Sequence, residues 1–170
     1  MERFQEELET GRRHLRTADH LVSITFPLVK DSRLLRTAME NLFVGAKNIM
    51  ASLLHYEETF KRIPHFQGDY DTMAHWFRSK CVPYYKLSRD YGVSLDELKV
   101  LAENHKTSAV EFTRGDGLVM FSDTYNFKKI TLAELKAYIG VMKRMLLDVE
   151  GVVSRYEGVF GRGPRGTKAR

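Results

Sequence analysis

The longest regular pattern in the chain is LRTAMENLFVGAKNIMASLLHYEETF, which runs from Leu35 to Phe60. Its apolar residues follow one another at alternating steps of four and three positions, which keeps them on one face of an α-helix. They are Leu35, Met39, Leu42, Ala46, Ile49, Leu53, Tyr56 and Phe60. At 1.5 Å per residue this apolar stripe is about 40 Å long, and no proline interrupts it. The pattern predicts the central helix of a helical bundle.

The two ends of this helix and one internal glycine are also informative. Asp31 or Ser32 can cap the start of the helix by accepting a hydrogen bond from a free amide. Ile63-Pro64 ends it, because proline lacks an amide donor. Gly45 lies inside the helix, where glycine costs about 1 kcal/mol relative to alanine. We therefore expect a neighbouring helix to cross closely at Gly45.

Apolar residues with helical spacing predict a first helix from about Glu2 to Thr25, with Gly11 on its apolar face. Proline disfavours a helical conformation at the residue before it. The sequence therefore predicts that the chain turns at Phe26, immediately before Pro27.

Two further helices are expected between the central helix and residue 110. The first begins near Asp71 and is stopped or kinked by Pro83. Ser94 and Glu97 have the spacing of a capping box, in which the serine hydroxyl and the glutamate satisfy each other's free amides. This spacing predicts the start of a helix that ends near Thr107 or Ser108.

The sequence then changes from helical to strand-like periodicity. Residues 110–114, 118–122 and 127–130 have strand-like patterns, and Gly115-Asp116-Gly117 and residues 123–126 are turn signals. Thr131 and Glu134 form a second capping box, and an apolar stripe with helical spacing follows from Leu132 to Phe160. These signals predict a short antiparallel meander followed by a long last helix.

We therefore predict a mainly α fold, an antiparallel bundle of four or five helices with a small antiparallel β-meander (about 109–131) before the last long helix. Residues 1–160 form a single helical-bundle domain, and residues 161–170 form a flexible basic tail. The central and last helices are expected to pack side by side. Their heptad-like spacing is also compatible with a homodimer.

The positive charge of the chain is concentrated at its end. The net charge is +5, and residues 161–170 contain four cations and no acid, which leaves +1 for residues 1–160. The start of the chain is charged, and no apolar run reaches the roughly 20 residues of a membrane span. The single cysteine, Cys81, excludes an intramolecular disulfide. These features predict a cytoplasmic protein with no membrane attachment.

Two groups of cations are candidates for binding RNA or an acidic partner. Arg12, Arg13 and Arg16 lie close together on the first helix, where they form either a solvated face or a phosphate-binding patch. The tail carries a second group, spaced by glycine and proline, that can follow a phosphate backbone or simply increase solubility. This group consists of Arg162, Arg165, Lys168 and Arg170.

Patterns for metal binding and nucleophilic catalysis are weak. Di-iron bundles use Glu-x-x-His pairs, whereas this chain has only the reverse order, His55-x-x-Glu58. One cysteine and six scattered histidines do not form a zinc motif. Cys81 lies in an apolar helical segment, which is typical of a buried, inert thiol. We predict no bound metal and no cofactor.

The segment HLVSITFPLVKD at residues 20–31, the long helix after it, and the strand at Val110 followed by a capped last helix carry a resemblance. In this order, residues 14–157 resemble a small family of uncharacterised archaeal helical proteins. The helices more distantly resemble the HEPN bundles, whose ribonucleases use a spaced Arg and His that complete a site across a dimer. The resemblance implies that Arg13 and His20 would be this pair, on the first helix rather than on a late one.

Three functions follow as hypotheses. The first is a non-enzymatic module that binds RNA or a ribonucleoprotein partner through the tail and the first-helix arginines. The second is a HEPN-like, metal-independent ribonuclease acting as a dimer, in which Arg13 stabilises the phosphate and His20 is the general acid or base. The third is a protein–protein interaction scaffold, with a bundle groove or the meander edge receiving a partner strand.

Overall fold

The computed structural model describes residues 1–115, 117–122 and 127–155, with the backbone alone described at 105–114, 121–122 and 127. The elements in chain order are α1 (Arg3–His20), η1 (Leu21–Thr25), α2 (Phe26–Val29), α3 (Ser32–Thr59), α4 (Tyr70–Trp76), η2 (Phe77–Cys81), α5 (Val82–Tyr85), α6 (Asp90–Thr107), β1 (Ser108–Arg114), β2 (Gly117–Ser122), β3 (Phe127–Thr131) and α7 (Leu132–Val153). The π-helical turns η1 and η2 continue into their neighbours without a break, so the described residues form five helices and one sheet. The predicted fold class is confirmed.

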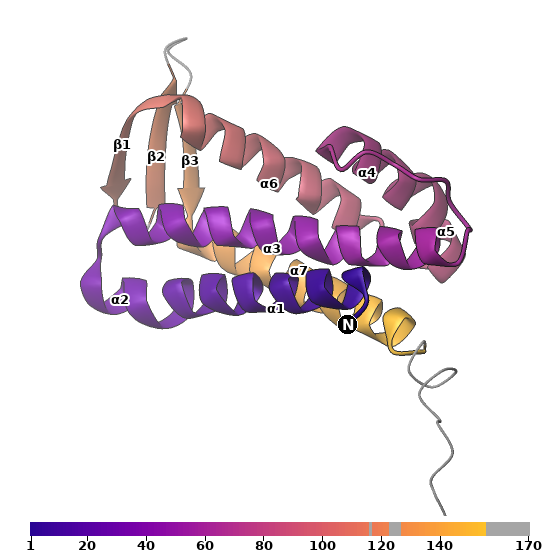
Figure 1. Ribbon diagram of the computed structural model, residues 1–170. Helices are drawn as coiled ribbons and strands as arrows, with labels where there is room; N and C mark the ends of the chain where they lie inside the picture. Colours follow the sequence, from indigo (N-terminus) through magenta and orange to yellow (C-terminus); the bar gives the residue numbers. More distant parts are fainter. Residues whose placement is uncertain (116, 123–126, 156–170) are drawn as a thin grey trace, which may run out of the picture.

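The bundle is assembled around α3 (Figure 1). α1 runs antiparallel to α3 and packs along its length, while α6 and α7 also contact α3. The sheet lies at the end of the bundle where α3 begins, and α4 and α5 lie at the end where α3 finishes. The predicted contact between α3 and α7 is present, but α1 is the most extensive partner of α3.

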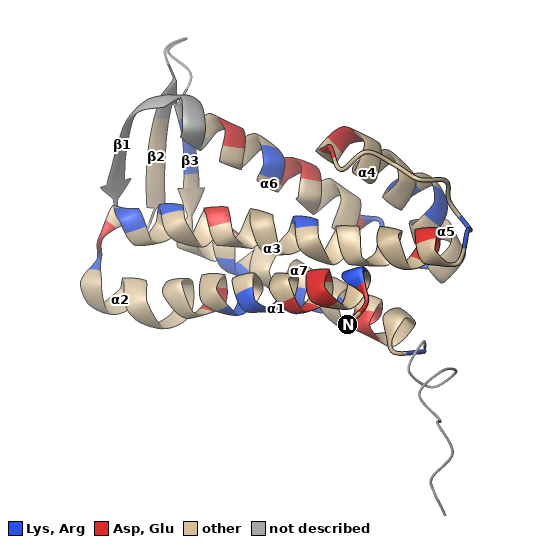
Figure 2. Cartoon of the chain, viewed as in Figure 1, with Lys and Arg blue, Asp and Glu red and all other residues tan. Residues whose placement is uncertain are grey.

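α3 supplies the centre of the hydrophobic core. Seven of its eight predicted stripe residues are buried, and only Phe60, which follows the helix, is partly exposed. Lys47 is the only Lys, Arg, Asp or Glu between Asn41 and Tyr56, so this part of α3 carries almost no charge (Figure 2). Towards its end α3 is buried on every side, which is typical of a central helix.

Gly11 and Gly45 allow α1 and α3 to pack closely. A Cβ atom at Gly45 would lie 3.1 Å from the Gly11 carbonyl oxygen, and one at Gly11 would lie 2.7 Å from Cγ1 of Ile49. Separations this short leave no room for a side chain on either residue. The close crossing predicted at Gly45 is therefore confirmed, and α1 is the helix that crosses there.

The three strands form an antiparallel meander in the order β1-β2-β3. Arg114 pairs with Gly117, so a two-residue connection joins β1 to β2. Gly115 in that connection has φ +65°, a conformation that favours glycine. Leu118, Met120 and Ile130 join the helical core, and one face of the sheet thus packs on the bundle. The turn predicted at 123–126 lies outside the described residues.

The prediction that the chain turns at Phe26 is wrong. The helix continues past Pro27 to Val29, because the N–H of Phe26 bonds to the carbonyl of Leu21 in a wider π-helical turn. A π-turn just before a proline makes room for the proline ring, which would otherwise clash with the preceding turn. The helix ends instead at Lys30, whose φ of +57° reverses the chain.

Two of the three predicted caps are present. The side chains of Asp31 and Thr131 accept hydrogen bonds from backbone amides at the starts of α3 and α7. The capping box at Ser94 and Glu97 is wrong, since α6 begins about one turn earlier, at Asp90. Glu97 instead accepts a hydrogen bond from the Tyr138 hydroxyl at 2.8 Å, which ties α6 to α7.

Among the described residues, no helix is both long enough and apolar enough to cross a membrane.

Candidate functional site

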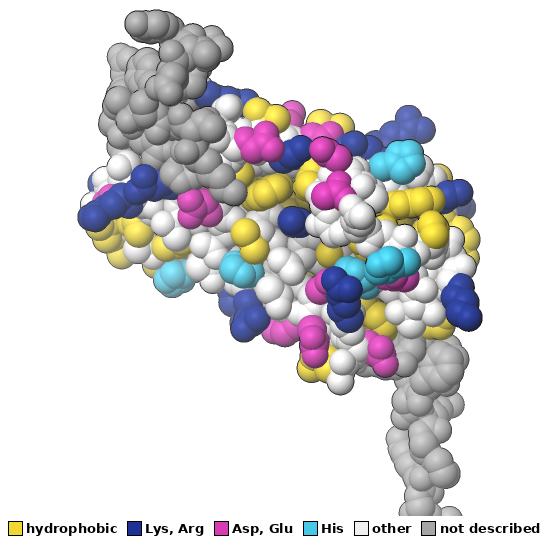
Figure 3. Space-filling view, turned by 45° about the horizontal axis from the view of Figure 1, so that its top comes forward, with side chains coloured by type: hydrophobic (Ala, Val, Ile, Leu, Met, Phe, Trp, Pro, Cys, Tyr) yellow, Lys and Arg dark blue, Asp and Glu magenta, His cyan; other side chains and the backbone are white. Residues whose placement is uncertain are grey.

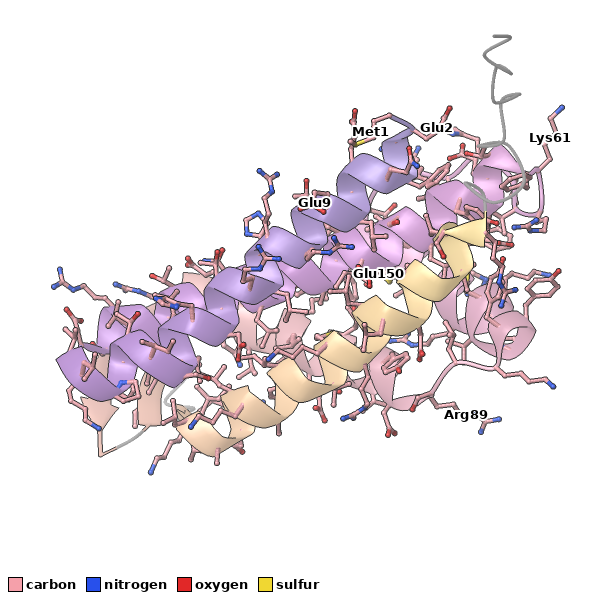
Figure 4. The ribbon with its side chains drawn as sticks, turned by 90° about the horizontal axis from the view of Figure 1, so that it is seen from below. Met1, Glu2, Glu9, Lys61, Arg89 and Glu150 are labelled. Atoms are coloured by element: carbon pink, nitrogen blue, oxygen red, sulfur yellow. The ribbon has the colours of Figure 1, made fainter. Side chains whose placement is uncertain are left out.

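Arg12, the first member of the predicted arginine patch, joins two helices. Its guanidinium lies 3.2 Å from Glu9 on α1 and also binds Glu150 on α7. Figure 4 shows Glu9 and Glu150 on these neighbouring helices. Because both carboxylates already neutralise it, Arg12 has little capacity left for an outside anion.

Arg13 and Arg16 are exposed on α1. Within the described part of the chain neither has a carboxylate partner, and Arg13 donates only to the Thr10 hydroxyl, at 3.2 Å. His20 is also exposed, seven residues beyond Arg13. Seven residues are close to two helical turns, so Arg13 and His20 share a face of α1 and are separated by about 10 Å along its axis.

The tail cations Arg162, Arg165, Lys168 and Arg170 lie outside the described residues. The last described residue, Arg155, is exposed and has no carboxylate partner among them. The described cations and acids are interspersed over the face shown in Figure 3, with no extended area of a single sign.

A buried carboxylate that sequence analysis missed lies at the end of α3. Glu57 is 4% exposed, and Arg62 binds it through two hydrogen bonds, of 2.9 and 2.8 Å. The Tyr85 hydroxyl donates to the same carboxylate. We call these three residues the Glu57 cluster. Burial and the bond to Glu57 raise the pKa of Tyr85, and the bond to Glu57 raises the pKa of Arg62. The cluster fastens the end of α3 to α5.

Cys81 lies beside this cluster and is buried, as predicted. Burial, with the nearby Glu57 carboxylate, raises the pKa of its thiol to about 12. The thiolate is the reactive form of cysteine. Cys81 is therefore an inert core residue at neutral pH.

A second polar contact of α3 is centred on His55, which is 6% exposed. Its Nδ1 lies 2.6 Å from the Glu7 carboxylate on α1, and its ring packs on Phe66 at a centroid distance of 4.8 Å. Glu58 lies 3.9 Å from the other ring nitrogen and 2.5 Å from Nδ1 of His65. In the sequence His55 and Glu58 form only a reversed metal motif, whereas in the structure they hold α1 and the 60–69 loop against α3.

These buried groups are enclosed by other protein groups and contact one another, so their arrangement suits stability better than catalysis. In the part of the chain that the structure describes, no group of three or more His, Cys, Asp or Glu side chains could hold a metal ion. The only sequence signal for Glu57 is that residues 48–56 before it contain no Lys, Arg, Asp or Glu, which is typical of a helix buried on all sides.

Two open hollows lie between helices of the described chain. The larger, of about 1140 Å³, lies between α1 and α7 and is bordered by Leu8, Leu147 and the Arg12–Glu150 pair. The smaller, of about 730 Å³, lies between α5 and the start of α6. Three cations line this smaller hollow, Arg78, Lys86 and Arg89, together with one acid, Asp96. We call it the basic cleft.

No protein-family model matches this chain, and no curated protein or solved structure matches it either.

Proposed function

We propose that this protein is a non-enzymatic module that binds RNA, alone or within a ribonucleoprotein, through the cations of residues 161–170 and the first-helix arginines Arg13 and Arg16. The observation that carries the proposal is that these two guanidinium groups are exposed and have no carboxylate partner among the described residues. Arg12 is left out because Glu9 and Glu150 already bind it.

The charge distribution supports this assignment. Residues 161–170 carry four cations and no acid, in a sequence rich in glycine. Such a segment can follow a phosphate backbone and release its counterions, without a groove of fixed shape. Arg13 and Arg16 would then add two phosphate contacts on a rigid helix.

The test is RNA binding measured by fluorescence anisotropy at several salt concentrations. Six phosphate contacts on a single strand give a slope of about −4 in log K against log salt, or roughly a 300-fold loss between about 50 and 200 mM salt. A chain shortened after residue 160 keeps two contacts, so its slope should fall to about −1.4. Binding with an unchanged slope after truncation, or no RNA binding at all, would overturn the proposal.

A matched pair of variants tests the helix contribution. Changing Arg13 and Arg16 together to Gln should lower the slope by about 1.4. Arg33→Gln is the control, because Arg33 is exposed but already bound to Asp31, with its Nε 3.0 Å from Oδ2. Equal effects of the double variant and of the control would show that the binding depends only on overall charge.

A metal-independent ribonuclease is the second candidate, favoured by the exposure of Arg13 and His20 on one face of α1. In this function Arg13 would stabilise the phosphate, and His20, from this copy or from a second copy, would transfer the proton. RNA cleavage in the presence of EDTA that disappears in His20→Ala would support it. Cleavage that persists in that variant would exclude His20 from the reaction.

A further inference from the structure

We propose that the basic cleft binds a small phosphate monoester that carries a flat ring, such as a nucleoside monophosphate. This proposal is independent of RNA binding by α1, because the described residues that line the cleft include neither Arg13 nor Arg16. Its volume of about 730 Å³ lies in the range of small-molecule sites, roughly 300–1,000 Å³.

The backbone places two free cations at the rim of the cleft. Lys86 has φ +53° and reverses the chain after α5, and the N–H of Leu87 bonds to the carbonyl of Val82 at 2.9 Å. Arg89 follows three residues after Lys86, just before α6 begins at Asp90. Both side chains are exposed, and among the described residues neither has a carboxylate partner. They are therefore available to an anion.

The third cation, Arg78, is held in place. It binds the Asp96 carboxylate and donates to the Gly92 carbonyl at 3.3 Å. A Cβ atom at residue 92 would lie 3.0 Å from Nε of Arg78, so glycine there leaves room for the guanidinium. Tyr70 donates to the other oxygen of Asp96 at 2.8 Å. Because Asp96 already neutralises Arg78, this residue shapes the cleft wall, and Lys86 and Arg89 are the cations left for the phosphate.

The charge of the cleft matches a phosphate monoester. Among the described residues, three cations and one carboxylate line the cleft, which gives these residues a net charge of +2. A phosphate monoester carries about −1.5 to −2 at neutral pH. Hydrogen bonds between charged groups of opposite sign are the strongest that such a site can form.

The rest of the wall is apolar and suits a ring. Val82, Pro83, Leu87 and Val93 line the cleft, and Val93 is 57% exposed. Ligand sites typically combine such apolar walls with a few polar groups that orient the ligand. A ring against Val93 and Pro83 would place an attached phosphate toward Lys86 and Arg89.

The test is calorimetric titration of the full-length protein with AMP, adenosine and inorganic phosphate. AMP should bind more tightly than either fragment. Lys86→Ala and Arg89→Ala should each weaken AMP binding about tenfold, and should leave adenosine binding unchanged. Val93→Glu, a change at an exposed position, should abolish AMP binding by adding a negative charge to the apolar wall.

Lys61→Ala is the matched control. Lys61 is exposed and has φ +56°, almost the same backbone conformation as Lys86, but it does not line the cleft. Figure 4 shows Lys61 well apart from Arg89. AMP binding that is absent, that is unaffected by the Lys86 and Arg89 variants, or that falls equally in Lys61→Ala would overturn the proposal. Thermal unfolding of each variant distinguishes lost binding from lost structure.

Discussion

Two helix termini, residues 21–30 and residues 77–86, share a backbone conformation but differ in their surroundings. Each has a five-residue π-helical turn, a residue whose N–H bonds five residues back, and then a proline. Each then has one more turn of α-helix and ends at a lysine with positive φ, +57° at Lys30 and +53° at Lys86. Equivalent residues therefore have nearly the same local geometry.

The contacts of the two ends differ at Val29 and Tyr85 and at Thr25 and Cys81, although Leu28 and its equivalent Tyr84 are both exposed. At the first end, Leu28 is 81% and Val29 is 60% exposed. At the second, Tyr85, the equivalent of Val29, donates to the buried Glu57, and Cys81 is buried. The comparison shows that the local sequence specifies the turn, whereas the elements packed against it determine how much it contributes to stability.

The largest difference between the two helix termini should appear in the free energy of unfolding when the Glu57 cluster is broken. Glu57→Gln removes the charge that Arg62 and Tyr85 bind, and leaves the guanidinium without a carboxylate. Arg62 is 35% exposed, so we expect a loss of about 2 kcal/mol in the free energy of unfolding, below the 3–5 kcal/mol typical of fully buried pairs. Urea denaturation measures this loss.

Leu28→Ser at the first end is the control for Glu57→Gln. Because Leu28 is exposed, this change should alter the free energy of unfolding by less than about 0.5 kcal/mol. Equal losses in the two variants would show that the two ends contribute alike and that the comparison is wrong.

A smaller but clear difference is expected in thiol reactivity. Native Cys81, with its pKa raised to about 12, should react with iodoacetamide at neutral pH on the order of 100-fold more slowly than an accessible cysteine. Its rate should keep rising as the pH approaches 12, because the buried thiol ionises only there. The comparison protein is Thr25→Cys in a Cys81→Ser background, since Thr25 is the partly exposed equivalent of Cys81. Matching rates in the two proteins would contradict the burial of Cys81.

The smallest effect concerns Lys30 and Lys86, the lysines with positive φ at these two helix termini. Glycine relieves about 1 kcal/mol of strain in this conformation, but loses much of that gain because it makes the unfolded chain more flexible. Lys86→Gly should therefore stabilise the protein by a few tenths of a kcal/mol. Lys30→Gly should be close to neutral, because it also removes the contact of the Lys30 ammonium with the Phe26 ring, 5.6 Å from the ring centroid. Thermal unfolding of the two variants side by side measures the difference, and a larger gain at Lys30 would contradict this explanation.

Much of the fold could be predicted because its signals are local. The stripe on α3, the caps at Asp31 and Thr131, and the turn at Gly115 each depend on residues within a few positions of one another. Pro27 was misread because the usual rule assumes that the α-helical register is kept, and a π-turn changes that register. Ser94 was misread because an earlier start at Asp90 placed its whole capping box inside the helix.

The candidate site was less predictable. The sequence pattern groups Arg12 with Arg13 and Arg16, because three cations within five positions are neighbours on any helix. It could not separate them, since Glu150, which binds Arg12, lies 138 residues away in the chain. The basic cleft was missed for the same reason: Arg78 belongs to the turn η2, while Gly92 and Asp96 belong to α6.

For this protein, the sequence by itself determined which segments are helical, where most of them are capped and which face of each is apolar, because periodicity and capping act over one or two turns. Only the tertiary structure decided which polar groups bind partners within the protein and which remain available to a ligand. The partners of Glu57, His55 and Arg12 come from distant parts of the chain, and the energy of a charged group depends on which partners reach it and on how far it is removed from water.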